Sequence, residues 1–161
     1  MRFEEWLKLF RKMHEDAKRG SLQGASLAEY HEARNELARA LLAAQHVGLA
    51  PGMQPRKTLR AACALQADLV FFDGTLRVAT RSLSAGGLAA VLPAPQRPGE
   101  DVKVTLRLPG GAALSCGASV VESKPQAGNA HVSFKWVGLS AADAERIETL
   151  VFDAVLEQLR S

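Results

Sequence analysis

Two arginines and a run of hydroxyl and glycine residues are the side chains whose types and spacing fit the binding of an anion. Arg56 and Arg60 are separated by three residues, and residues 82–87 read Ser-Leu-Ser-Ala-Gly-Gly. A guanidinium group offers a rigid fork of donors that matches phosphate oxygens, and a turn rich in hydroxyls and glycine can close on the same ligand. Together the two segments predict a binding site for an anionic ligand.

Each of these residues also has a structural interpretation. Arg56 and Arg60 could lie on a solvated linker that binds nothing. The hydroxyls of Ser82 and Ser84 could bond to the backbone of their own turn, and the glycine pair that follows could supply positive φ angles. We favour a site because the two segments occur together.

Composition narrows the class of protein. The chain has 161 residues, of which 23% are charged and 47% hydrophobic, as in ordinary soluble globular proteins. The net charge of +3 is too small for a protein that depends on nucleic-acid phosphates. Charges interrupt every long apolar run, so we expect a cytoplasmic protein without a membrane span. Cys63 and Cys116 are too few for a disulfide framework, and we expect them to be reduced and buried.

Residues 1–48 predict a helical hairpin. Phe3, Trp6 and Phe10 form one apolar stripe, and a second helix is expected to begin at Ser26, where residues 26–29 fit a capping box. Basic and acidic side chains alternate along the first helix, which argues against a lipid-bound helix. We therefore expect this hairpin to pack on the rest of the chain, on a second copy or on a protein partner.

The period of the apolar pattern changes to two after a linker at residues 49–55. Strands are expected at 65–72, 75–81, 88–92, 102–108 and 113–122 and around 132–136, and Asp73-Gly74 predicts a tight hairpin between the first two. A closing helix should start at Ser140. The fold is therefore predicted to be mainly β with flanking helices: a small antiparallel barrel of six strands, with the closing helix plugging or flanking it, over residues 56–161.

The Arg-x-x-x-Arg segment before the barrel, the Ser-x-Ser-x-x-Gly turn and the late Val-Ser-Phe strand resemble the PilZ domain, whose members bind cyclic di-GMP. The resemblance covers residues 56–160 and implies a six-stranded PilZ-like barrel. It assigns the two arginines to the phosphates and to the O6 and N7 edge of guanine. The ligand residues that it implies are Arg56, Arg60, Ser82, Ser84 and Gly87, with Lys57 and Arg81 as possible accessory residues and with no metal or cofactor.

This sequence departs from the family pattern at two positions. Ser82 stands where the family usually has Asp or Asn, and losing a charge-assisted hydrogen-bond acceptor there would cost about 1–3 kcal/mol of binding free energy. Pro55 replaces a further arginine found in relatives that bind a stacked pair of ligands. The resemblance therefore implies one nucleotide per chain.

Two functions from different classes follow from these observations. The first is a cyclic di-GMP receptor that transmits ligand binding to its N-terminal helices or to a protein partner. The second is a degenerate PilZ-like adaptor that binds proteins and no nucleotide. Catalysis has little support, because the four histidines lack metal-ligand spacing and no nucleophile or phosphate-loop motif is present.

Overall fold

The computed structural model describes residues 2–47 and 59–159 of the chain. These residues form two compact units, Met1–Leu59 and Arg60–Ser161. The predicted linker at 49–55, together with Arg56 and Lys57, lies outside the described residues.

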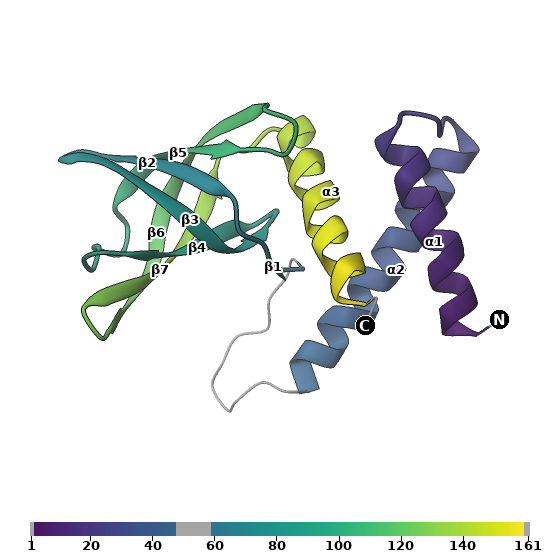
Figure 1. Ribbon diagram of the computed structural model, residues 1–161, viewed down its shortest axis with the longest axis horizontal. Helices are drawn as coiled ribbons and strands as arrows, with labels where there is room; N and C mark the ends of the chain where they lie inside the picture. The colour runs from purple at the N-terminus through teal and green to yellow at the C-terminus, as the bar shows by residue number, and fades with distance from the viewer. Residues whose placement is uncertain (1, 48–58, 160–161) are drawn as a thin grey trace. The chain divides into compact units, whose positions relative to one another are not determined.

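The first unit is a pair of helices, α1 (Phe3–Lys18) and α2 (Ala25–Val47), shown in Figure 1. Aromatic rings join the two helices. The Phe10 ring stacks on Tyr30 with 5.9 Å between the centroids, and the Tyr30 hydroxyl lies 2.7 Å from Nδ1 of His14. All three side chains are buried. The predicted helical hairpin is therefore held by a buried aromatic cluster that includes the polar contact between Tyr30 and His14.

The predicted capping box at Ser26 is wrong. Ser26 already lies inside α2, and its hydroxyl donates to the carbonyl of Gln23 at 2.8 Å. The first helical bond runs from the amide of Ala28 to the carbonyl of Gly24 at 3.1 Å. Gly24 has a φ of 57°, a conformation that glycine adopts without a steric penalty. The tight connection between the helices therefore determines where α2 begins.

The second unit is a closed antiparallel barrel. Its strands are β1 (Ala61–Ala62), β2 (Gln66–Phe71), β3 (Gly74–Ser84), β4 (Gly87–Leu92), β5 (Asp101–Arg107), β6 (Ala113–Gln126) and β7 (Asn129–Val137). Hydrogen bonds connect them in the order β3-β2-β5-β6-β7-β4, and β4 pairs back with β3 (Figure 1). The short β1 is an extra strand on β3. The predicted six-stranded barrel is thus confirmed, and closing it leaves no long unpaired edge.

Alternating side chains fill the barrel. On β5, Val102, Val104 and Leu106 are buried, whereas the residues between them are exposed or partly exposed. β2 and β3 meet in the predicted tight hairpin, in which Phe71 pairs with Gly74. One face of each of these strands therefore forms the core and the other the outer wall.

The helix α3 (Ala141–Gln158) follows the barrel. The Ser140 hydroxyl accepts a hydrogen bond from the amide of Asp143 at 3.1 Å and caps the helix. Ile147, Val151 and Phe152 are fully buried, and α3 contacts β1 and β3. The helix therefore flanks the barrel and does not plug it (Figure 1). None of the described helices combines the length and apolar character needed to cross a membrane.

Gly87 marks the closest approach between β4 and β7. It pairs with Lys135, and a Cβ atom added to it would overlap the carbonyl oxygen of Phe134. Its φ is not in the positive range, so the alternative interpretation, in which it supplies a positive φ, is wrong. The glycine is needed because the neighbouring backbone lies where a side chain would begin.

Replacing Gly87 should therefore destabilise the barrel. Gly87→Ala forces β4 away from β7, and we expect a loss of about 3 kcal/mol in the free energy of unfolding, measured by chemical denaturation. Gly117→Ala is the matched control, because a Cβ atom there would meet only the Val137 carbonyl oxygen at 3.7 Å. Equal stability of the two variants would contradict this account.

The contact between Tyr30 and His14 in the helical unit can also be tested by substitution. Tyr30→Phe removes the partner of a buried histidine nitrogen and should lower the stability of the helical unit by about 1–3 kcal/mol. The decrease in stability is measured from the loss of the helical circular dichroism signal on heating. Replacing His14 by Phe as well removes both polar groups, so the double variant should recover part of the loss. No effect of Tyr30→Phe would show that the contact contributes little.

Candidate functional site

The turn between β3 and β4 is built around the side chain of Ser84. Its hydroxyl oxygen accepts hydrogen bonds from the amides of Gly86 and Gly87, both at 3.1 Å, and lies 3.4 Å from the Gly87 carbonyl. The side chain is only 2% exposed. These bonds match the structural interpretation raised above, in which the hydroxyl closes its own turn.

Trp136 of β7 holds the same turn from the neighbouring strand. Its indole Nε1 donates to the Ser84 carbonyl and its backbone amide donates to the Gly86 carbonyl, both at 3.1 Å. The Trp136 side chain is half-buried. An aromatic residue with a donor at its rim can pack and still reach a polar partner. The turn is therefore fixed by its own serine and by β7.

Ser82 lies on the last part of β3, two residues before Ser84, and is half-buried. The strand has a bulge just before it, because Thr80 pairs with Ala90 while Ser82 pairs with Ala89. The extra residue, Arg81, is exposed. Bulges redirect side chains, and this one changes the alternation along β3 just before the predicted site.

The strand β1 brings Arg60 to this part of the barrel. Ala61 pairs with Leu83 and Ala62 with Ser82, in antiparallel register. If that register is continued by one residue, Arg60 stands opposite Ser84. Arg60 is half-buried. Of the predicted ligand residues, the structure thus brings Arg60, Ser82, Ser84 and Gly87 to one end of β3, with Arg81 beside them, whereas Arg56 and Lys57 lie outside the described residues.

Thr80 is a polar residue of this region that lies outside both sequence motifs. Its hydroxyl donates to the Cys63 carbonyl at 2.6 Å and accepts from the Leu65 amide at 2.8 Å, and its own amide donates to the Leu65 carbonyl at 2.8 Å. The side chain is 2% exposed. A threonine on a strand carries no sequence signal for such a role, because only the folded chain brings residues 63–65 beside it.

Cys63 follows β1, and its thiol is close enough to Asp153 of α3 for the charge of that residue to act on it. Burial raises its pKa, and the negative charge of Asp153 raises it further. The thiol is only half-buried, as is that of Cys116, so the expectation that both cysteines are buried is wrong. Cys63 should consequently react slowly with thiol reagents at neutral pH, because the thiolate is the reactive form.

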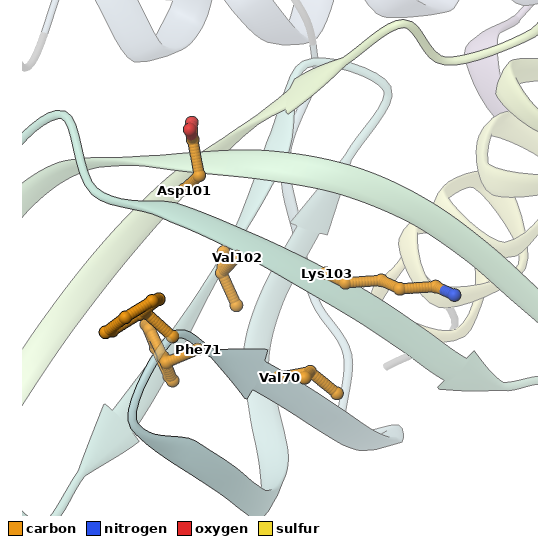
Figure 2. A pocket seen from close by; sticks show the side chains of 6 residues that line it. Val70, Phe71, Asp101, Val102 and Lys103 are labelled. Carbon is orange, nitrogen blue, oxygen red and sulfur yellow. The ribbon is translucent and has the colours of Figure 1, made fainter.

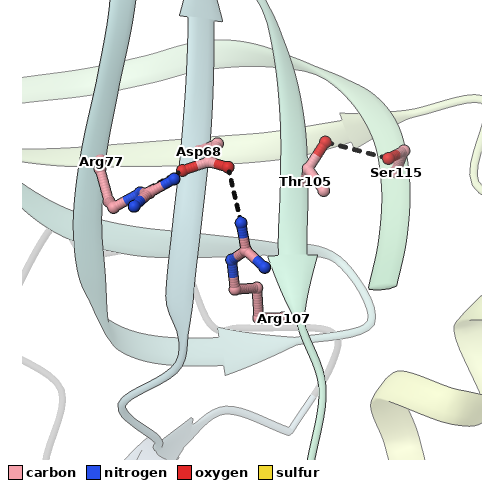
Figure 3. Close-up of polar contacts among 5 residues, drawn as sticks. All are labelled: Asp68, Arg77, Thr105, Arg107 and Ser115. Atoms are coloured by element: carbon pink, nitrogen blue, oxygen red, sulfur yellow. Dashed lines mark hydrogen bonds and ion pairs between the residues drawn. The ribbon is translucent and has the colours of Figure 1, made fainter. Parts of the chain in front are cut away.

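A second group of charges lies on the outer wall of the barrel (Figure 3). Asp68 binds Arg77 at 3.0 Å and Arg107 at 3.7 Å, and the hydroxyls of Thr105 and Ser115 lie 2.9 Å apart. The two arginine side chains are 63% and 55% exposed. Exposed ion pairs of this kind contribute under about 1 kcal/mol of stability, and the group is best described as a solvated polar face.

An open apolar hollow lies at the far end of β3. It has a volume of about 450 Å³ and is lined by Val70, Phe71, Phe72, Asp101, Val102 and Lys103 (Figure 2). Since β3 has 11 residues, its two ends are separated by roughly 35 Å. The hollow is therefore distinct from the predicted anion site. Among the residues that the structure describes, no group of acidic, histidine and cysteine side chains could hold a metal ion.

Solved structures with the same fold come from several bacteria. The motility inhibitor MotI (DgrA) of Bacillus subtilis is 22% identical, with a TM-score of 0.55 over 68% of this chain and 53% of its own. The PilZ domain of Escherichia coli YcgR, solved with c-di-GMP, is 16% identical, with a TM-score of 0.57 over 65% of this chain and 95% of its own. The MrkH–c-di-GMP complex of K. pneumonia is 18% identical, with a TM-score of 0.59 over 67% of this chain and 56% of its own.

These likenesses establish the fold, and the chain spans only about half the length of MotI and MrkH. No significant relative was found among curated proteins. The family itself is identified by a match of the PilZ domain to residues 54–153, which include the arginine pair, the serine turn and most of α3. The chain therefore belongs to the PilZ domain family.

Proposed function

We propose that this protein is a receptor for cyclic di-GMP. The observation that carries the proposal is the pairing of β1 with β3, which brings the residue after Arg60 opposite Leu83, between the two serines. Membership of the PilZ family supports it, as do two solved PilZ proteins described with c-di-GMP. The ligand is a dianion with two guanine bases, so the site must supply both cationic and neutral donors and acceptors.

Arg56 and Arg60 supply the charge in this proposal. Each guanidinium can bind a phosphate bidentately or bind the O6 and N7 acceptors of guanine, which a lysine ammonium cannot do with the same geometry. Lys57 and Arg81 add electrostatic attraction. Because Arg56 and Arg60 lie on the segment that joins the helical unit to the barrel, capture of the nucleotide changes the freedom of that segment and is transmitted to the helices or to a partner.

The serine turn has a divided role in this proposal. The Ser84 hydroxyl and the amides of Gly86 and Gly87 bond to one another, so they shape the turn. The Ser82 hydroxyl has no hydrogen-bond partner within the described part of the chain, and in this proposal it is the group that faces guanine. A single neutral hydroxyl in place of a carboxylate gives weak binding, and one nucleotide per chain remains the expected stoichiometry.

A protein-binding adaptor is the second candidate, and one feature of the helical unit favours it. The Phe3 side chain is 56% exposed, and it borders a hollow of about 180 Å³ between α1 and α2 that Trp6, Glu36, Leu37 and Ala40 also line. An exposed aromatic ring beside an apolar hollow is typical of a protein contact. This surface fits either function, because a receptor also needs a surface through which it contacts its protein partner.

Replacing Arg60 tests the receptor function. Titration calorimetry with cyclic di-GMP should give a weak, saturable signal for the wild type and a loss of at least about tenfold in affinity for Arg60→Ala, because a charge-assisted contact to phosphate is removed. Arg77→Ala is the control, since Arg77 is an exposed arginine bound to Asp68 on the outer wall. An absence of any binding by the wild type at high micromolar ligand would remove the receptor function and leave the adaptor.

Replacing Ser82 tests the site from the other side. Ser82→Asp restores an acceptor for the guanine edge and should strengthen binding by about tenfold, despite the added negative charge. Ser115→Asp adds the same charge to the exposed outer wall and should leave the affinity nearly unchanged. If both aspartates weaken binding to the same extent, Ser82 does not face the base.

A further inference from the structure

The chain between β1 and β2 is attached to β3 by few bonds. The strand β1 has only two residues, and beyond it the Cys63 amide donates to the Arg81 carbonyl at 3.3 Å. The remaining contacts involve Thr80, whose hydroxyl bonds to both the Cys63 carbonyl and the Leu65 amide. One buried side chain thus holds both ends of residues 63–65.

Thr80 lies next to the part of β3 that carries the predicted ligand residues. Thr80 lies immediately before the bulge at Arg81, and Ser82 follows it. The residues that it holds continue directly into β1, whose register sets the place of Arg60 along β3. The same threonine therefore connects the segment that carries the arginine to the strand that carries the serines.

We propose that Thr80 is a positioning residue for ligand binding, which sets the place of Arg60 relative to Ser82 through its hydroxyl bonds to residues 63 and 65. The inference rests on the proposed cyclic di-GMP function and adds a residue outside both motifs. Thr80 itself is buried and touches no ligand. Without its hydroxyl, the Cys63 carbonyl and Leu65 amide each lose a buried partner. The register is then maintained by the two-residue β1 and by two backbone bonds, from the Cys63 amide to the Arg81 carbonyl and from the Thr80 amide to the Leu65 carbonyl.

The first test compares Thr80→Val with Thr80→Ser in the full chain. Valine keeps the shape and removes both bonds, so cyclic di-GMP affinity should fall about tenfold in calorimetry. Serine keeps the hydroxyl, and its affinity should stay within about twofold of the wild type. Thr105→Val is the matched control, because it removes a hydroxyl that bonds to Ser115 on the outer wall. All titrations are run well below the unfolding temperature of each variant, and wild-type affinity of a folded Thr80→Val protein would overturn the proposal.

A double-mutant cycle distinguishes positioning from a general loss of stability. If Thr80 acts through Arg60, Thr80→Val should have little further effect on affinity in an Arg60→Ala protein. A threonine that only stabilises the barrel would show independent, additive losses, and that result would overturn the proposal. Ser82→Asp, introduced into both backgrounds, keeps the affinities within the measurable range.

Whether the Thr80 hydroxyl holds residues 63–65 to β3 can also be tested without ligand. This test distinguishes failure of the positioning proposal from failure of the receptor function. In a Cys116→Ser background, Cys63 is the only thiol and lies within the held segment. Its rate of reaction with an aromatic disulfide reagent should rise several-fold in Thr80→Val and stay near the starting rate in Thr80→Ser and Thr105→Val. An unchanged rate in Thr80→Val would show that the hydroxyl does not hold the segment, whatever the wild type binds.

Discussion

The attachment of residues 61–65 to β3 is the contact on which the candidate site depends. It consists of a two-residue ladder, one further backbone bond from the Cys63 amide, and the bonds of Thr80. Each ordered residue costs about 1–2 kcal/mol of backbone conformational entropy. A ladder of two residues therefore adds little net stability. If the proposed receptor function holds, a change in a few hydrogen bonds there would alter where Arg60 lies, and low local stability is a common property of segments that respond to a ligand.

The turn at the end of β3 is constructed in the opposite way. Ser84 closes it from within, Trp136 binds two of its carbonyls, and Gly87 allows the Phe134 backbone to approach. These contacts leave the turn little freedom to adjust. In the proposed receptor, this turn would supply fixed geometry, while the few bonds of residues 61–65 to β3 would allow Arg60 to respond to the ligand.

The sequence predicted most of the fold correctly, and for identifiable reasons. Val102, Val104 and Leu106 alternate with exposed or partly exposed residues, and Asp73-Gly74 is a tight-turn signal, so local chemistry alone indicated strands and their hairpin. Ser140 was recognisable as a helix start for the same reason. The errors arose where neighbours distant in sequence decide the outcome. Ser26 bonds backward because the connection between α1 and α2 is tight, and Gly87 is needed for a backbone contact with β7.

The sequence by itself determined the alternation that makes a barrel, the helical stripes, and the arginine and serine motifs, because each depends on residues within one or two turns of each other. Only the tertiary structure decided that β1 pairs with β3 beside Ser82, that Ser84 is occupied by its own turn, and that Thr80 holds residues 63 and 65. Those contacts join residues that the chain itself separates, and their geometry exists only after the barrel has closed and set the register between its strands.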